Sequence, residues 1–323
     1  MAASISSKGG LTRLEQAAFG VCGLACVAAV TLIIHFRIQV DGASLFAAAA
    51  VLVFLGIAYV VYRRWRPAPV ISNLCGALCV VAFSGAMAGI VSLIGLRCRA
   101  TLIDAHLADL DRSLGFDTTT IVHAIAHSPA MANLLGIAYQ SSSALIFGVA
   151  VLLAVTRRFQ QLWTLAFVFA ATILLCTAIS VPVPARGAFA YFGHQADLLD
   201  RLPSGSGVYH LSKFDYYRDD LNPIISFAQL QGVVTFPSFH CCLALMTIAA
   251  CKGIRWLVPL SFVWNVLVII STVPVGGHYV IDLLAGTTVW FVAAVATSAL
   301  TGSTVFSRRL LSRRHAYDTA PAS

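Results

Sequence analysis

Eight apolar segments restrict the fold of this chain more than any other feature of its sequence. They run for 15 to 27 residues with almost no charged side chains, and an α-helix needs about 20 such residues to cross a bilayer. The segments are residues 16–35, 43–62, 70–96, 131–155, 160–181, 237–251, 254–273 and 279–300. Segment 237–251 is the shortest, and it suffices only if Pro237 to His240 lie within the membrane boundary. We therefore predict an all-α integral membrane protein with about eight transmembrane helices.

The amount of charge excludes several other classes of protein. Only 11% of the 323 residues are charged, whereas soluble domains carry about 25%. A soluble globular enzyme or a disordered chain would need more polar surface than this sequence supplies. The net charge of +8 suits a nucleic-acid-binding protein in principle, so the position of each charge decides how it is interpreted.

The basic residues follow the predicted topology. With eight spans, 13 of the 21 lie on the side that holds the N-terminus, loops 63–69 and 156–159, the turn at 252–255 and the C-terminal tail. By the positive-inside rule this side is cytoplasmic. Eleven of the 13 acidic residues lie on the other side or at its edge. We therefore expect cytoplasmic termini, extracytoplasmic connections 97–130 and 182–236, and no nucleic-acid partner.

The two long connections contain predicted structure of their own. In the first, apolar residues and one histidine recur at three- and four-residue steps, which favours a helix lying at the membrane surface. These residues are Leu102, Ile103, His106, Leu107, Leu110 and Leu114. Asp117 is a good N-cap for a second short helix over 118–127. The second connection exceeds 50 residues, and a loop of that length is usually functional.

Two short segments place ionisable groups at the start of predicted spans. Thr235–His240 (TFPSFH) opens the sixth span, and Gly276–Asp282 (GGHYVID) opens the eighth. Both spans are even-numbered, so both segments face the same side of the membrane, which the charge distribution makes the outer side.

The first segment favours an anion site. Pro237 just inside a helix start and Ser238 near the cap leave backbone N–H groups and the positive end of the helix dipole pointing outward, which suits a phosphate. Gly276 and Gly277 allow close approach of the backbone at the second helix start.

The second segment favours a histidine with an orienting carboxylate. His278 and Asp282 are four residues apart and share one helical face. The carboxylate can accept the N–H of one imidazole nitrogen and leave the other as a nucleophile or base. His240 then supplies the second half of an acid–base pair. An unpaired Asp inside a span costs about 3 kcal/mol, which argues that Asp282 is functional.

Pro237-Ser238-Phe239-His240, followed by His278-x-x-x-Asp282, resembles the second and third signature motifs of the type 2 phosphatidic acid phosphatase superfamily. The sequences of the two motifs, TFPSFH and GGHYVIDLLAG, are similar to those of the branch containing inositol phosphorylceramide synthases and their bacterial relatives. The resemblance implies metal-independent phosphoryl transfer through a phosphohistidine, without a cofactor. It assigns His278 as the nucleophile, Asp282 as its orienting partner and His240 as the acid on the leaving group, with Ser238 binding phosphate.

The resemblance spans about residues 70–300, which divides the chain into three parts. These are a two-helix extension (1–69), a six-helix catalytic domain (70–302) and a basic cytoplasmic tail (303–323). The implied substrate is a phospholipid or an isoprenoid or sphingolipid phosphate. The implied location is a bacterial inner or plasma membrane, with an extracytoplasmic active site.

Two phosphate-binding cations of the superfamily are missing or displaced. The first motif, a Lys and an Arg-Pro at fixed spacing, is absent in that form, and Thr272 stands where the third motif has Arg. We assign Arg218 with His210 as the substitute phosphate clamp, because guanidinium binds phosphate in a bidentate manner. Lys213 and Gly277 complete the predicted phosphate-binding set.

The motifs leave the reaction partly open. Water as acceptor makes the protein a phosphatase, and a hydroxyl makes it a phosphotransferase; the branch resemblance favours headgroup transfer of the inositolphosphotransferase type. Two other classes are possible in principle. A lipid or solute transporter would use the helix starts as a binding site, and His240, His278 and Asp282 form a two-His-one-carboxylate metal set. The sequence does not determine the oligomeric state.

Overall fold

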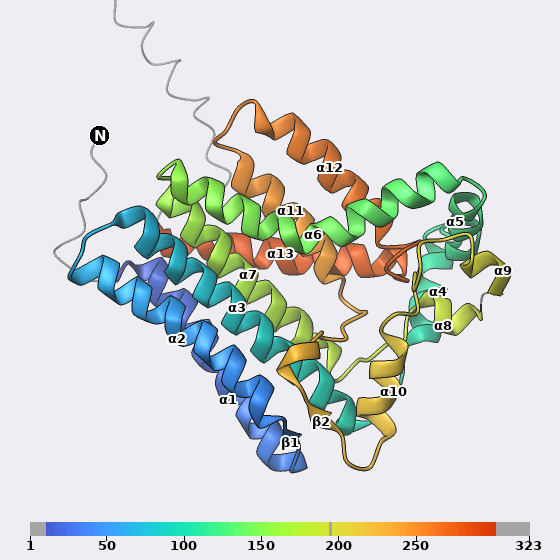
Figure 1. Ribbon diagram of the computed structural model, residues 1–323. Helices are drawn as coiled ribbons and strands as arrows, with labels where there is room; N and C mark the ends of the chain where they lie inside the picture. The colour runs from blue at the N-terminus through green and yellow to red at the C-terminus, as the bar shows by residue number, and fades with distance from the viewer. Residues whose placement is uncertain (1–10, 194–195, 302–323) are drawn as a thin grey trace, which may run out of the picture.

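The computed structural model describes residues 11–193 and 196–301, which form a helical bundle (Figure 1). The helices are α1 (Arg13–Phe36), α2 (Gly42–Arg64), α3 (Pro69–Gly95), α4 (Asp104–Ser113), α5 (Thr118–Ala126), α6 (Pro129–Val155), α7 (Phe159–Ser180), α8 (Ala188–Phe192), α9 (Ala196–Leu199), α10 (Leu211–Asp219), α11 (Phe239–Cys251), α12 (Leu257–Ser271) and α13 (Val280–Thr301). Strands β1 (Gln39–Val40) and β2 (Ile224–Ile225) pair in parallel. The predicted basic tail, 303–323, lies outside the described residues.

Six helices of the described chain are long and apolar enough to cross a membrane: α1, α2, α3, α6, α7 and α13. Helices α11 and α12 have 13 and 15 residues. At about 1.5 Å per residue they reach about 20 Å and 22 Å, less than the roughly 30 Å of a hydrocarbon core. The helical architecture, with six candidate spans among the described residues, is consistent with the predicted all-α membrane protein, and the total of eight spans stays a prediction.

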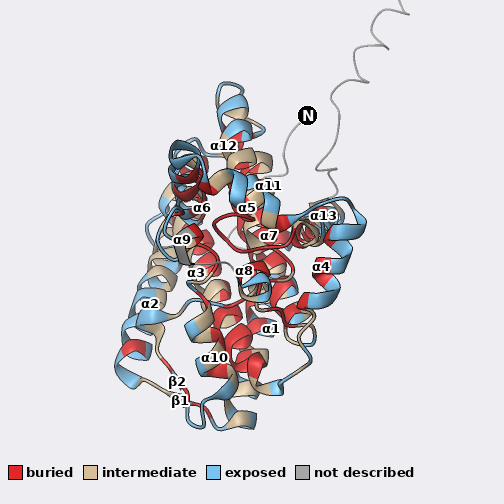
Figure 2. Ribbon diagram, turned by 90° about the vertical axis from the view of Figure 1, so that its right-hand side faces the viewer, coloured by how far each residue is buried: buried red, intermediate tan, exposed pale blue. Residues whose placement is uncertain are grey.

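Helices α3 and α7 form the centre of the bundle. Helix α3 packs against α1, α2, α6 and α7, and α7 also contacts α11 and α13. Buried residues concentrate on these central helices (Figure 2). Large apolar side chains are instead exposed on outer helices, among them Phe46, Phe54, Trp256 and Phe262. Such a surface suits contact with lipid rather than water.

Helices α1 and α2 confirm the two predicted N-terminal helices. Thr12 and Glu15 form a capping box at the start of α1. Glu15 is buried and accepts from Arg63 at the end of α2, with Nη1 2.7 Å from Oε1. The α1–α2 turn carries β1 and so pairs with the long connection before α11. The ion pair thus joins α1 to α2 at one end of the extension, and the strand pair ties the other end to the rest of the chain.

The polar connections gather at one end of the bundle, on the right in Figure 1, where α4, α5, α8, α9 and α10 lie. Asp117 caps α5 by accepting a backbone N–H at 2.9 Å, as predicted. Helix α4 forms where a helix was expected, but its buried face differs. Asp104 and Asp111 are buried, whereas Leu110 and Leu114 are exposed. The aspartates point inward because they bind backbone N–H groups of the site described next.

Candidate active site

The two predicted motifs meet at the polar end of the bundle. The backbone N–H of Ser238, which precedes α11, donates to the carbonyl of Asp282 in α13 at 3.0 Å. Gly286, one turn later in α13, lies directly against the Ser238 carbonyl, and a Cβ there would come within 2.3 Å of that oxygen. The absence of a side chain at Gly286 therefore allows the two helix starts to lie side by side.

His278 and Asp282 form the predicted pair. Nδ1 of His278 is 3.0 Å from Oδ2 of Asp282, and the N–H of Tyr279 donates to the same oxygen at 3.0 Å. Both side chains are buried, with 3% and 0% of their surface exposed. Because the carboxylate accepts the Nδ1 proton, Nε2 carries the free lone pair. Nε2 lies 3.4 Å from Oγ of Ser238.

Burial sets the protonation state of the imidazole. His278 lies in the loop between α12 and α13, and desolvation lowers its pKa to about 4. At neutral pH the ring is therefore uncharged, which is the state that a nitrogen nucleophile requires.

A cavity of about 240 Å³ is lined by all three histidines of the predicted site: His210, His240 and His278. The ring centroids of His240 and His278 are 6.5 Å apart, and the His240 ring stacks on Tyr139 at 4.2 Å. The imidazoles that the two motifs supply therefore line one cavity, and one of them is held by a carboxylate.

His210 enters the cavity from the connection before α10. Its Nε2 donates to the carbonyl of Arg186 at 2.8 Å, so its Nδ1 has the free lone pair. Burial lowers the pKa of His210 below its ordinary value, which favours the neutral ring in the empty cavity.

The two predicted cations lie outside the cavity. Lys213 donates through Nζ to the carbonyl of Gln229 at 2.9 Å and to Oε1 of Gln231 at 3.3 Å. Arg218 donates to the carbonyl of Ala100 at 2.9 Å. Within the described residues, no Lys or Arg lines the cavity. The structure therefore brings together His210, Ser238, His240, His278 and Asp282, and leaves Lys213 and Arg218 on other partners.

A family model described as the PAP2 superfamily matches residues 105–296. The chain belongs to the PAP2 superfamily. The match covers more than half of the chain and includes both motifs, so His240 and His278 lie within the matched part, whereas the cavity wall contributed by α3 precedes it. Comparison with curated proteins and with solved structures gives no match.

The backbone of this PAP2 chain uses Gly277 for packing. Its φ of +75° suits glycine, and a Cβ there would lie 2.8 Å from Cα of Gly207. Its N–H donates to the carbonyl of Val273 and its own carbonyl accepts from Ala188. Both backbone groups of Gly277 are thus engaged within the protein. Other backbone segments of the protein, and not a ligand, make the close approach that was expected at Gly277. The predicted contact between Gly277 and phosphate therefore gains no support.

The two helix starts at the PAP2 site are not equivalent. Helix α11 begins at Phe239, which lines the cavity together with His240. The hydroxyl of Ser238 accepts from the N–H of Cys241 at 3.5 Å, so the N–H groups of Phe239 and His240, which have no intrahelical partner, are the donors that α11 offers at the cavity wall. The first N–H groups of α13 are instead bound by a carboxylate. This difference makes α11 the helix start available to an anion.

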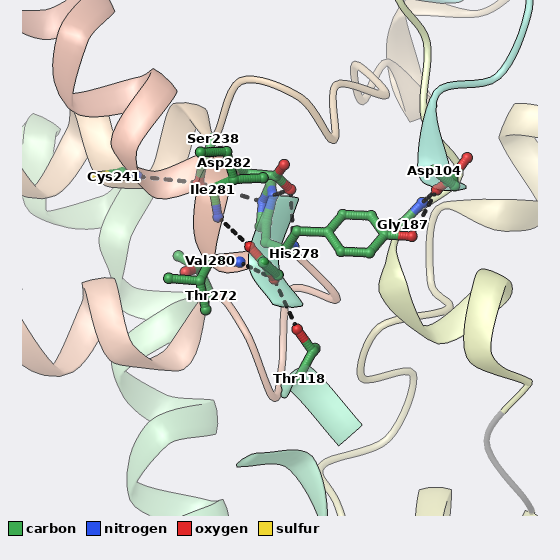
Figure 3. A network of polar contacts seen from close by, with 12 residues as sticks. Asp104, Thr118, Gly187, Ser238, Cys241, Thr272, His278, Val280, Ile281 and Asp282 are labelled. Atoms are coloured by element: carbon green, nitrogen blue, oxygen red, sulfur yellow. Dashed lines mark hydrogen bonds and ion pairs between the residues drawn. The ribbon is translucent and has the colours of Figure 1, made fainter. Parts of the chain in front are cut away.

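Asp111 of α4 is the carboxylate at the start of α13, and its partners Thr118, Val280 and Ile281 are labelled in Figure 3. Its two oxygens accept from the N–H groups of Val280 and Ile281, each at 2.8 Å. Thr118 of α5 donates to the same carboxylate at 3.0 Å. A negative group at a helix N-terminus is stabilising, and here it also fixes the position of the turn that carries His278.

Asp104 holds a second pair of segments together. It accepts from the N–H groups of Arg186 and Gly187 at 3.0 and 2.9 Å, and from the hydroxyl of Tyr279 at 3.1 Å. Sequence reasoning missed both aspartates as site residues. A signal was present, because Asp104 and Asp111 are seven residues apart and share the helical face of Leu107.

The metal-site alternative does not fit the geometry. Oδ2 of Asp282 already accepts from His278 and Tyr279, and the Nδ1 of His278 faces that carboxylate. In the part of the chain that the structure describes, no three His, Cys, Asp or Glu side chains are arranged to hold a metal ion.

Replacing Asp111 with asparagine should lower kcat by about 100-fold, since a displacement of about 1 Å can cost that much. One amide oxygen cannot accept from both N–H groups, so the turn carrying His278 shifts. KM should change little, because Asp111 does not line the cavity. Steady-state kinetics on a lipid phosphate measures both constants. Asp109→Asn is the matched control, since Asp109 is exposed and pairs only with Arg112 among the described residues; an equal loss in both variants would contradict a positioning role.

Proposed function

We propose that this protein transfers the phosphoryl group of a lipid phosphate ester through a phosphohistidine on His278. Members of the PAP2 superfamily are phosphatases and phosphotransferases, so membership supports phosphoryl chemistry. The observation that carries the proposal is the buried His278–Asp282 pair, whose free Nε2 belongs to a cavity shared with His240. This arrangement supplies a nucleophile, its orienting group and a proton donor in one enclosure.

In the first half-reaction, Nε2 of His278 attacks phosphorus and the bond from phosphorus to the leaving alcohol oxygen breaks. His240 gives that oxygen its proton, so the alcohol departs neutral. A phosphate between the two rings favours a protonated His240, because an opposite charge nearby stabilises the charged imidazole. Asp282 stabilises the positive charge that develops on His278 as the new P–N bond forms.

In the second half-reaction, an oxygen of water or of an acceptor alcohol attacks the same phosphorus. The P–N bond breaks, His278 recovers its lone pair, and His240 takes the proton of the attacking oxygen. Both catalytic histidines return to their starting states. The two half-reactions use the same groups in reverse order, which is why the motifs alone do not choose between phosphatase and phosphotransferase.

The phosphate is held without lysine or arginine in the cavity wall. The candidates are the first N–H groups of α11, the hydroxyl of Ser238 and the ring of His210. Dipolar groups of this kind bind anions at helix starts.

The remaining walls suit the first carbons of a lipid alcohol. Four small or apolar residues of α3 and α7 contribute to these walls: Gly85, Ala88, Gly89 and Ile173. An amphiphilic phosphate ester therefore fits both ends of the cavity.

The similarity of TFPSFH and GGHYVIDLLAG to the inositol phosphorylceramide synthase branch favours headgroup transfer over hydrolysis. The long connection before α11 supports the same preference, because Gln231 and Thr235 contribute to the cavity wall and can screen the intermediate from water. The charge distribution places this end of the bundle outside the cytoplasm and both termini inside. Metal independence follows from the histidine mechanism and is part of the proposal.

The test uses the purified full-length protein with phosphatidylinositol or phosphatidic acid labelled with ³²P in the phosphate. Each donor is offered with and without ceramide and inositol. We expect label in a new phospholipid or in the product of hydrolysis, which is inorganic phosphate from phosphatidic acid and inositol phosphate from phosphatidylinositol. Protein-bound label should survive alkali and be lost in acid. Turnover should persist in a strong chelator. Binding of the donor without any product would favour the transporter alternative, and protein-bound label that is absent at all times would contradict the phosphohistidine.

A further inference from the structure

A second cavity of about 300 Å³ adjoins the first and has no role in the steps above. The two cavities share four wall residues: Ser143, Tyr209, Gln231 and His240. The other walls of the second cavity come from the middle of α6, from residues 203–206 and from Val275. His240 therefore lines both cavities.

The walls of the second cavity are polar but uncharged. Gln140, Ser143, Ser204 and Gln231 contribute amides and hydroxyls that are exposed at its rim, and these groups both donate and accept hydrogen bonds. Within the described residues, no Asp, Glu, Lys or Arg lines this cavity. An ionic ligand would find no opposite charge, whereas a neutral molecule with several hydroxyls would find partners on each side.

A tyrosine pair connects this cavity with the catalytic histidine. The hydroxyls of Tyr139 and Tyr209 are 2.8 Å apart, so one donates to the other and the accepting hydroxyl keeps a proton of its own to donate. Tyr139 also stacks on His240 at 4.2 Å. A hydroxyl bound beside this pair lies next to the imidazole that accepts a proton in the second half-reaction.

We propose that the second cavity binds a neutral polyhydroxyl acceptor, such as a cyclitol or a small polyol, which receives the phosphoryl group from His278. The proposal rests on the phosphohistidine mechanism above. An acceptor oxygen attacks phosphorus from the side that the leaving group vacated, where His240 stands. The P–Nε2 bond breaks, the new P–O bond forms, and His240 takes the proton of the acceptor hydroxyl.

The experiment measures how the phosphoryl group divides between water and acceptor. The full-length protein is given phosphatidic acid labelled with ³²P, a monoester donor, with myo-inositol, glycerol or the neutral control tert-butanol at equal concentrations. The readout is the ratio of phosphorylated polyol to inorganic phosphate. We expect polyol phosphate with inositol or glycerol and none with tert-butanol.

A variant of the second cavity sharpens the test. Gln140 lines only this cavity, so Gln140→Leu should lower the ratio of transfer to hydrolysis by about tenfold, the effect of one or two lost hydrogen bonds. Gln160→Leu is the matched control, since Gln160 is exposed at the start of α7 and lines neither cavity. A ratio is insensitive to the fraction of folded protein.

The outcomes separate the two proposals. Release of inorganic phosphate that no polyol diverts would overturn the acceptor cavity and leave the phosphohistidine intact. A ratio that is equal in Gln140→Leu and Gln160→Leu would also overturn it. A different outcome is that the turnover rate depends on the headgroup of the lipid donor while free polyols receive no phosphoryl group. This outcome would show that the second cavity holds the donor instead of an acceptor. Absence of any phosphoryl product would overturn both proposals.

Discussion

Replacing His278 with alanine should abolish turnover of the lipid donor, with a loss of about 10⁴-fold or more, as expected when the nucleophile of a covalent mechanism is removed. In the proposed mechanism Nε2 of His278 receives the phosphoryl group. Among the described residues, no other imidazole of the cavity has a carboxylate behind it, because His210 donates to a carbonyl and His240 stacks on Tyr139. Product release and protein-bound ³²P should be lost together.

Two further variants make this result specific. His106→Ala is the control, because His106 is exposed on α4 and lines no cavity of the site. Asp282→Asn should also be severely impaired, because an amide no longer favours the tautomer with a free Nε2. Normal turnover in His278→Ala, with the protein correctly folded by its thermal unfolding, would show that the phosphoryl group does not pass through this residue.

Replacing His240 with alanine should slow turnover of an alkyl phosphate ester by about 10²- to 10⁴-fold, the usual contribution of a general acid or base. The loss should depend on the leaving group. A nitrophenyl ester releases a stable phenolate that needs no proton, so formation of the phosphohistidine should survive in this variant. The intermediate should then accumulate, because no base remains to activate the acceptor.

Rapid-quench kinetics tests this result directly. In His240→Ala we expect a burst of nitrophenolate close to one equivalent per protein, followed by slow turnover and persistent protein-bound label. The wild-type protein should show little accumulated label. An equal loss with alkyl and nitrophenyl esters would contradict the acid role and leave His240 as a residue that only binds or shapes the cavity. Tyr139→Phe keeps the aromatic ring stacked on His240. This variant should therefore show the same nitrophenolate kinetics as the wild-type protein.

Several features of this protein follow from short-range patterns in the sequence. Membrane helices α1, α2, α3, α6, α7 and α13 satisfy their backbone within one segment, so apolar runs alone predict them. The cap at Asp117 involves residues two and three positions away. The His278–Asp282 pair is also local, although His278 lies in the loop before α13 and not on the helical face that was predicted: four residues separate it from the carboxylate in the first turn of that helix. These interactions need no knowledge of the rest of the fold.

Local sequence patterns were not sufficient to predict which residues bind phosphate. The predictions for Lys213 and Arg218 depended on the path of the connection between α7 and α11. That path is set by contacts between distant backbone segments, such as the N–H of Gly207 donating to the carbonyl of Val275 and that of Ala188 donating to Gly277. Such contacts involve groups common to every residue, so side-chain identity does not reveal them.

By itself the sequence determined a membrane-embedded helical bundle and the residue types of a histidine-based phosphoryl site. Only the tertiary structure decided which of those residues share a cavity, and that α4 supports the site. The bonds from Asp111 to Val280 and Ile281 join residues about 170 positions apart. A carboxylate in an amphipathic helix can form its hydrogen bonds equally well with water, so the sequence does not reveal that Asp104 and Asp111 are buried. Their burial becomes evident only when the fold brings unpaired backbone N–H groups next to them.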